Sequence, residues 1–405
     1  MRSCSLAWFS VNLLLLTANY AAFDEPELEE TNSLDVLREH VELGEFQLAV
    51  DEVSIQINEI RKESGNFSAR LAEPYIVLGD AQLGLGEVED AVDSFTTALK
   101  VTRMNKGLNS TDQMSSLYRI AAAQAELGEY QNANEAHERA YAIMLNQLGS
   151  KNPQLLPSML NLIDWYESNR RFSAAKILYI EAIQIANRAI PKDDVRQVEL
   201  ARAFAAGMRN TVFPPMDGDS RYRGFDVEVP GYEPPPPGKS PPSSYSLGQR
   251  ALIDVVNFVE THAPSDRETI ALAKLNLADW HQLFGRESKA TRMYRDIWVE
   301  LDSLPELRKS FFSEPKILYI RLPEFSASSD TTQFGVVELL LTVSYRGAVT
   351  GRISQVVEPP NTDIEFRTRV AAREARFRPA IKDGRPLTTR DFLLTHYYPL
   401  PKRTP

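Results

Sequence analysis

The most constraining feature of this 405-residue chain is a turn that returns every 42 residues. The sequence Leu-Gly-Glu occupies residues 43–45, 85–87 and 127–129, and a degenerate copy, Asn-Arg-Arg, occupies 169–171. Five residues after each central turn position comes an alanine: Ala49, Ala91, Ala133 and Ala175. Four copies at one spacing predict a single structural unit that is repeated along the chain.

Each unit is predicted to be two amphipathic helices around a tight turn. Glycine suits that turn because the residue that ends the first helix adopts a positive φ. The alanines mark the places where two helices approach closely. A larger side chain four residues later is expected to pack between units, and these side chains are Val53, Phe95, His137 and Tyr179. His137 is therefore expected to be a packed side chain rather than a metal ligand.

The repeated unit resembles the tetratricopeptide repeat. The positions that fit that family best are Tyr75, Leu78, Gly79, Gly86, Ala91, Phe95 and Ala98. The usual period of the family is about 34 residues, so a period of 42 implies longer helices or loops. The resemblance implies an α-solenoid over residues 31–209 that binds proteins or peptides.

A further copy of the repeat comes later in the chain. Asn-Leu-Ile-Asp-Trp at 161–165 returns as Asn-Leu-Ala-Asp-Trp at 276–280, and Gly285, Ala290 and Tyr294 then occupy the turn, alanine and packing positions. Residues 195–209 and 247–262 also have helical patterns. We therefore expect more repeat-like helices over residues 247–304.

A proline-rich insertion, residues 210–246, interrupts the helical pattern. Nine of the 32 residues 214–245 are proline and four are glycine, a composition typical of low-complexity segments. A long surface loop is the expected structure. A peptide ligand and a spacer are the alternatives, although a spacer would normally connect two domains rather than interrupt one.

The pattern changes to a period of two after residue 304. Residues 337–343 predict a strand with one buried face, Arg346-Gly347 a turn, and residues 349–357 a second strand. Pro359 and Pro360 end that strand. A helix capped by Thr362 or Asp363 is expected next, with Phe366, Val370 and Ala371 as its apolar residues. A turn at Asp383-Gly384 and a last strand over 388–398 complete the region.

This β-β-α-β order resembles the C-terminal domain of TonB-type energy transducers over residues 310–400. The residues that carry the resemblance are Arg376, Phe377, Arg378, Pro379, Ala380, Asp383, Gly384, Arg385 and Pro386. The resemblance implies a small α+β domain in the periplasm whose strand edge pairs with an extended segment of an outer-membrane protein. The sequence departs from that family because helical repeats replace the linker and the N-terminal segment holds no histidine.

The expected fold class is thus mainly α, a repeat solenoid followed by a small α+β domain.

Residues 1–22 predict a signal peptide, because Arg2 precedes an apolar run at 6–16 and small residues follow at Ala18, Ala21 and Ala22. The apolar run is shorter than the ~20 residues of a spanning helix. Cleavage would remove Cys4, the single cysteine, and a cysteine-free secreted chain fits the periplasm of a Gram-negative bacterium.

Composition and the absence of certain sequence motifs argue against several classes of function. A net charge of −10 argues against a dedicated nucleic-acid binder. One cysteine excludes a disulfide framework, and the five histidines have no metal-binding spacing. The sequence holds no nucleophile elbow, phosphate loop or dinucleotide fingerprint. We therefore expect no enzyme activity, cofactor or metal.

The predicted function is a non-catalytic periplasmic adaptor. Its solenoid is expected to bind one envelope protein or peptide, and its TonB-like domain another, such as an outer-membrane protein. The alternative is a membrane-anchored TonB-type transducer for outer-membrane transport, which requires residues 6–22 to remain attached and span the inner membrane, so that the rest of the chain faces the periplasm. A third possibility is an envelope enzyme with a site at Asp164 or Asp279.

A partner groove is expected along the first helices of the repeats. Its residues are Asp80, Tyr118, Asn161, Asp164, Glu167, Asn276 and Asp279. The Asn-Leu-x-Asp-Trp recurrence also has a structural explanation, with Trp165 and Trp280 as packing residues and the polar residues as inter-repeat hydrogen bonds. In the C-terminal domain, Arg376, Arg378 and Arg385 are expected to form either a basic edge or salt bridges to the acidic solenoid.

Overall fold

A computed structural model describes residues 28–215, 243–322 and 334–400. The predicted signal peptide and most of the proline-rich insertion lie outside these residues. The chain forms two compact units, one up to residue 108 together with residues 126–128, and one that comprises residues 109–125 and everything from 129 onwards. Each unit is described by itself.

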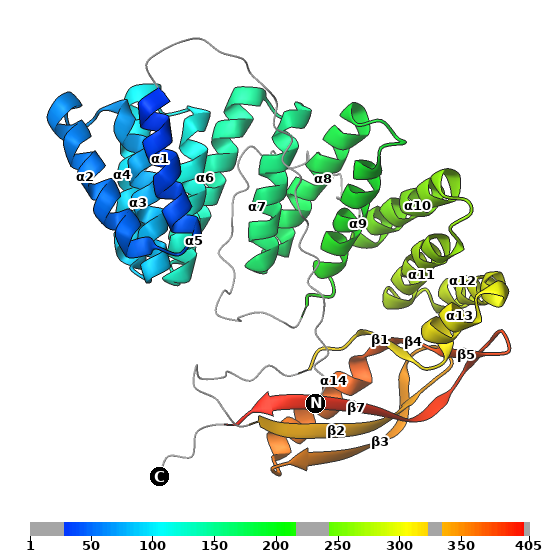
Figure 1. The fold of residues 1–405 in the computed structure, drawn as a ribbon. Helices are drawn as coiled ribbons and strands as arrows, with labels where there is room; N and C mark the ends of the chain where they lie inside the picture. The colour runs from blue at the N-terminus through cyan, green and yellow to red at the C-terminus, as the bar shows by residue number, and fades with distance from the viewer. Residues whose placement is uncertain (1–27, 216–242, 323–333, 401–405) are drawn as a thin grey trace, which may run out of the picture. The chain divides into compact units, whose positions relative to one another are not determined.

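The first unit contains two helical pairs (Figure 1). These are α1 (Leu28–Glu42) with α2 (Phe46–Ser64), and α3 (Ala72–Leu85) with α4 (Val88–Lys106). Their apolar stripes meet in one core, in which Val53, Leu71 and Ala98 are fully buried. The apolar residues that give the sequence its amphipathic spacing are therefore the ones that pack between the helices.

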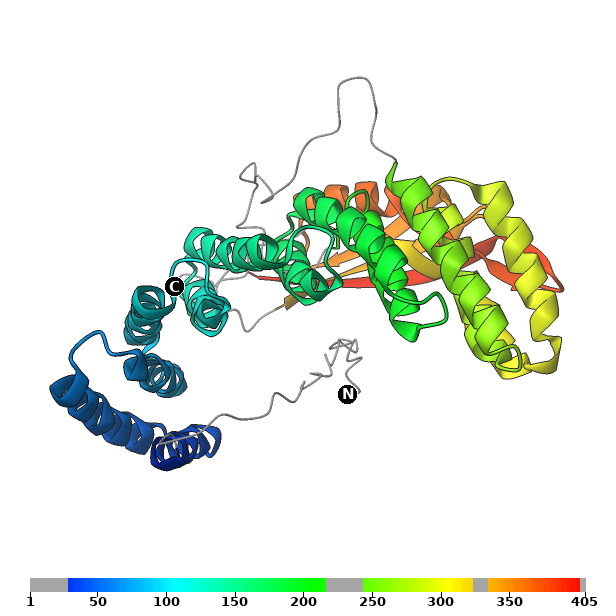
Figure 2. The ribbon, with the colours of Figure 1, turned by 90° about the horizontal axis from the view of Figure 1, so that it is seen from above.

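The second unit continues with the same kind of helical pair, and Figure 2 shows the helices from α7 (green) to α12 (yellow) in chain order. The helices are α5 (Met114–Glu126), α6 (Tyr130–Leu148), α7 (Leu156–Ser168), α8 (Phe172–Ala189), α9 (Val195–Asn210), α10 (Ser244–His262), α11 (Arg267–Leu283), α12 (Glu287–Glu300) and α13 (Pro305–Phe312).

Backbone geometry explains both the turn and the long period. Gly44, Gly86 and Gly128 have φ of 79°, 80° and 77°, and Arg170 adopts the same conformation at 59° although it carries a side chain. The extra length lies after the second helix of each pair. There a second set of positive-φ glycines is followed by a short 3-10 helix that leads into the next pair. These glycines are Gly65, Gly107 and Gly149.

The proline-rich insertion lies within a helical pair rather than between pairs. Helices α9 and α10 pack against each other, and the insertion connects them. Beyond it, Gly285 has φ of 72°, and Ala290 and Tyr294 are fully buried between α11 and α12. The repeat pattern therefore resumes after the insertion.

A small β-rich region follows the helices. Strands β2 (Phe334–Val343), β3 (Val349–Glu358) and β7 (Thr389–Pro399) form an antiparallel sheet in the order β3-β2-β7, and α14 (Thr362–Glu374) packs against β2 and β3. Two smaller antiparallel pairs complete the region. They are β1 (Lys316–Tyr319) with β4 (Arg376–Arg378), and β5 (Ala380–Lys382) with β6 (Arg385–Leu387).

The orientation of α14 differs from the sequence expectation. Its cap is Asn361, whose side chain accepts from the backbone N–H groups of residues 363 and 364. Phe366 and Val370 face solvent, while Ile364 and Thr368 face the sheet. Gln355 of β3 donates to the Thr368 hydroxyl at 2.7 Å. Of the three predicted apolar residues only Ala371 is buried, and the polar Thr368 occupies a buried position that the apolar pattern did not indicate.

The β-rich region and the last repeat share one core. Ile381 of β5 packs in a buried cluster with Leu275 of α11, Tyr294 of α12 and Phe312 of α13. Figure 1 shows these helices against β1, β4 and β5. The C-terminal region is thus joined to the last helical pair by packing as well as by the chain.

Close packing at Gly79 provides a test of the repeat geometry. A Cβ at this position would lie 2.4 Å from the Phe95 ring. We expect Gly79→Ala to lower the free energy of unfolding by about 1–3 kcal/mol, because the ring cannot move within a packed core. Urea unfolding of the full chain measures this. Adding Phe95→Leu should make Gly79→Ala less costly, and strictly additive effects would contradict the contact.

Candidate functional site

Three rings from three helices lie next to one another in the second unit. The His137 ring of α6 stacks on Trp165 of α7, with centroids 4.5 Å apart. The Tyr118 ring of α5 also adjoins His137, with centroids 5.8 Å apart and the two ring planes tilted by 49°. We call this region the α7 surface and define it as Tyr118, His137, Asn161, Asp164 and Trp165.

Hydrogen bonds hold the α7 surface in place. Asn161 Oδ1 lies 3.2 Å from His137 Nδ1, and Trp165 Nε1 donates to Asn134 Oδ1 at 3.1 Å. Asn134 is buried and its amide nitrogen also donates to Glu138 at 2.7 Å. The aromatic residues are therefore positioned before any partner arrives, which lowers the entropic cost of binding.

Burial changes the charge properties of this surface. Desolvation lowers the pKa of His137 to about 4, so the ring is neutral near pH 7. Partial burial raises the pKa of the neighbouring Asp164 carboxyl, although the residue remains solvent-exposed. Burial also raises the pKa of Glu167, which accepts from the Tyr179 hydroxyl at 3.1 Å and from Asn210 at 3.3 Å.

This arrangement favours one kind of contact. A partly desolvated carboxylate gains most from a cation or a strong hydrogen-bond donor placed beside it. Trp165, the next residue of α7, and the adjoining His137 and Tyr118 rings offer aromatic surface, which suits the stem and head of an arginine or lysine. The α7 surface can thus hold a cationic segment of another protein.

The second copy of the Asn-Leu-x-Asp-Trp sequence has a different role. Asp279 accepts from Arg378 at both oxygens, from Nε at 3.0 Å and from Nη2 at 2.7 Å. The Tyr294 hydroxyl donates to the same carboxylate at 2.7 Å, and Arg378 Nη1 donates to the Phe311 carbonyl at 2.9 Å. We call this cluster of Asp279, Tyr294 and Arg378 the repeat–sheet lock.

The lock is buried and its charges depend on each other. The side chains of Arg378 and Asp279 are 10% and 15% exposed. Burial opposes the positive charge of Arg378, but the adjacent Asp279 outweighs it, and the net effect raises the pKa of the guanidinium. Asp279 was predicted to line a partner groove, and the structure instead uses it internally. Of the alternatives for Arg378, the salt bridge to the solenoid is the one the structure shows.

The other predicted groove residues lie in separate places. Asn161, Asp164 and Glu167 all belong to α7, and Tyr118 joins them through His137. Asn276 is exposed on α11. Asp80 belongs to α3 in the first unit and is half-buried. The structure therefore brings together the α5–α7 part of the predicted set.

The remaining TonB-like motif residues are mainly structural. Phe377 and Ala380 are buried, and so is Pro379. Arg376 donates to the Glu374 carbonyl at 3.0 Å, which keeps it at the end of α14. Asp383 and Gly384 have φ of 51° and 69° and form the predicted turn between β5 and β6.

Sequence reasoning missed the polar residues that support these sites. Gln282 is buried and donates to the Arg346 carbonyl in the β2–β3 turn at 2.6 Å. Asn134 and Tyr294 likewise act through contacts far apart in the chain. The one signal in the sequence was that Tyr294 and Tyr179 occupy the same position of the repeat. In the structure the hydroxyl of each donates to a carboxylate, that of Asp279 and that of Glu167.

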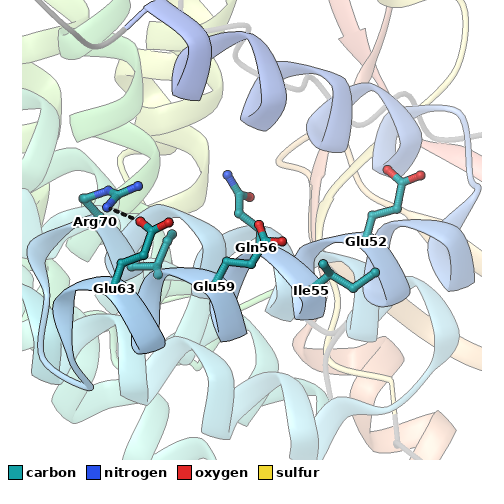
Figure 3. Close-up of a pocket in the computed structure, with 7 residues that line it drawn as sticks. Glu52, Ile55, Gln56, Glu59, Glu63 and Arg70 are labelled. Carbon is teal, nitrogen blue, oxygen red and sulfur yellow. Dashed lines mark hydrogen bonds and ion pairs between the residues drawn. The ribbon is translucent and has the colours of Figure 1, made fainter.

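The first unit carries a separate surface pocket of about 330 Å³ on α2 (Figure 3). Glu52, Glu59 and Glu63 line it together with Ile55. Arg70 forms an ion pair with Glu63 at 3.1 Å. The pocket is shallow and acidic, and it holds no arrangement of base and nucleophile.

Among the described residues, no group of histidine, cysteine and acidic side chains is arranged to hold a metal ion. Within the same described ranges, no helix has the length and apolar character needed to cross a membrane.

Comparison with protein families supports the repeat assignment. The tetratricopeptide-repeat family model matches residues 112–188, which comprise α5 to α8 and hence the α7 surface. This segment is built of tetratricopeptide repeats. The match does not reach the C-terminal region. No curated protein matches the chain.

Several solved structures share a general likeness. Repeats of a putative kinesin light chain from Podosopora anserina are 16% identical, with 59% of this chain and 100% of that chain covered and a TM-score of 0.43. BtubC from P. vanneervenii is 15% identical, with 70% and 96% covered and a TM-score of 0.38. The TPR2AB domain in a pHSP90 complex of yeast Sti1 is 12% identical, with 70% and 95% covered and a TM-score of 0.24.

The repeat–sheet lock predicts a large and specific loss of stability. Arg378→Met should lower the free energy of unfolding by about 3–5 kcal/mol, because it leaves Asp279 buried without its cation. Arg378→Met combined with Asp279→Asn should cost less than the sum of the single changes. Urea unfolding of the full chain measures both. Arg376→Met is the matched control on the same strand, and an equal loss there would contradict the lock.

The His137 environment predicts a pH-dependent stability difference. The pKa of His137 is about 4 when folded and near 6.5 when unfolded, so the unfolded chain binds the extra proton first as pH falls. Protonation of His137 therefore does not lower the free energy of unfolding above about pH 6.5. Between pH 6.5 and pH 4 it lowers it progressively, by at most about 2 kcal/mol at pH 5.

His137→Phe should remove this contribution, and phenylalanine occupies the same position in another repeat at residue 95. Urea unfolding of both proteins at pH 7 and pH 5 measures it. Buried His281 also has its pKa lowered to about 4, but it contributes equally to both proteins. Parallel pH dependences in the two proteins would show that His137 titrates normally.

Proposed function

We propose that this protein is a non-catalytic interaction scaffold of the bacterial cell envelope with two binding surfaces. The α7 surface binds a cationic segment of one protein. The sheet of the C-terminal region binds an extended segment of another, such as an outer-membrane protein. The observation that carries the proposal is the pairing of exposed Asp164 with the pre-positioned His137–Trp165 stack inside tetratricopeptide repeats.

The C-terminal part of the proposal rests on sheet geometry and on sequence. Strands β3 and β7 are the outer strands of the β3-β2-β7 sheet, so each has one side without a neighbouring strand in that sheet. Leu393 and Tyr397 of β7 are exposed. The order β2, β3, α14, β7 matches the β-β-α-β resemblance to TonB-type domains, in which an outer strand accepts an extended partner.

The periplasmic location rests on residues 1–22 as a cleaved signal peptide. N-terminal sequencing of the native protein tests this. A start at residue 22 or 23 in the soluble periplasmic fraction fits the scaffold. Met1 retained in the inner membrane would instead support the alternative function, a membrane-anchored TonB-type transducer for outer-membrane transport.

Point variants test the two surfaces better than truncation does. A chain cut near residue 310 would expose the core that Ile381 shares with α11 to α13. Asp164→Lys changes the α7 surface, and Leu393→Glu with Tyr397→Glu places charges beside the β7 edge, where they oppose strand addition. The matched controls are Asp193→Lys and Val195→Glu, at exposed positions elsewhere.

Affinity capture from envelope extracts, quantified by mass spectrometry, measures the outcome. Asp164→Lys should deplete one group of partners by about tenfold and the β7 variant a different group, with neither control having an effect. Loss of one identical group in both variants would contradict two separate surfaces. No loss in either variant would reject the proposed function.

A further inference from the structure

A groove lies between α12 and the β5–β6 hairpin, and the proposed function makes no use of it. Its volume is about 570 Å³. Helix α12 lines one side with Arg292, Arg295, Trp298 and Val299, and Arg385 of β6 lines the other. The last repeat and the C-terminal region thus build this groove together.

The groove is held in a fixed shape. A Cβ at Gly384 would lie 3.6 Å from the Trp298 ring, so the hairpin turn lies against the indole. The Arg308 guanidinium lies 4.4 Å from the centroid of the same ring. On the other side of the hairpin, Ile381 is buried in the shared core. Neither wall can move without disturbing this packing.

The three arginines of the groove have unused binding capacity. Among the described residues, none of Arg292, Arg295 and Arg385 has an ion-pair partner, and all three are exposed. The chain as a whole has a net charge of −10, so these three arginines form a local positive cluster on an acidic protein. A guanidinium fork binds a carboxylate through two parallel hydrogen bonds.

We propose that this groove binds an acidic peptide segment of a partner protein in which carboxylates flank an apolar residue. Asp296 and Asp383 also line the groove, and they leave its three arginines a net charge of only +1. A dense polyphosphate or an anionic lipid surface would meet these two carboxylates. A peptide can place single carboxylates on the arginines and its apolar side chain on Trp298 and Val299, the latter 64% exposed.

Fluorescence anisotropy with the full chain tests this. The probe is a short labelled peptide in which glutamates alternate with leucine, and its glutamine counterpart is the comparison. Arg292→Gln with Arg295→Gln should weaken binding of the glutamate peptide at least about tenfold, and Arg385→Gln should weaken it as well. Added salt should also weaken binding. The matched control, Arg139→Gln with Arg202→Gln, removes the same charge from α6 and α9 and should leave the affinity unchanged.

Several results would overturn the proposal. These are no binding by the unaltered protein, equal binding of the glutamine peptide, or an equal loss in the control variant. Competition by inorganic phosphate, or binding of phosphatidylglycerol vesicles in place of the peptide, would assign the groove to phosphate chemistry. Asp164→Lys should leave peptide binding intact, so failure here and failure at the α7 surface remain distinguishable.

Discussion

The ion pair between Asp279 and Arg378 is the interaction on which the organisation of the second unit depends. It joins residues 99 positions apart in the chain and is shielded from water on most sides. Removing two charges from water is costly, and a close bidentate geometry with further hydrogen bonds offsets that cost. Tyr294 and the Phe311 carbonyl supply those bonds. The pair therefore selects one placement of the β-rich region on the last repeat rather than simply adding stability.

The two copies of the Asn-Leu-x-Asp-Trp sequence show how one motif acquires two roles. In both copies the tryptophan Nε1 donates to an oxygen of the preceding helical pair, Asn134 Oδ1 for Trp165 and the Tyr245 carbonyl for Trp280. The aspartates differ because of what covers them. Asp279 is covered by strand β4, whereas Asp164 has no such cover and remains exposed. A position at the end of the solenoid becomes an attachment point, and the same position in its middle stays open to a partner.

The period of the sequence pattern was enough to predict most of the fold. The 42-residue repeat predicted the turns, even at Arg170, because a constant interval outweighs the identity of one residue. It could not show that α14 buries Thr368, because the buried hydroxyl donates to the Ile364 carbonyl of its own helix and also accepts from Gln355, which lies in another structural element. For the same reason the sequence placed Asp279 in an open groove. Its partner Arg378 lies in another structural element, and no spacing rule connects the two.

The packing of the C-terminal region changes how partner binding should be understood. A domain on a flexible tether loses orientational freedom when a partner binds, and this loss weakens the complex. Here the lock and the shared core around Ile381 have already removed that freedom during folding. The proline-rich insertion does not restore it, because it connects α9 to α10 and not the helices to the sheet. A partner that meets the hairpin groove therefore meets α12 and β6 in one fixed geometry, and a partner of the sheet is held in a defined orientation to the last repeat.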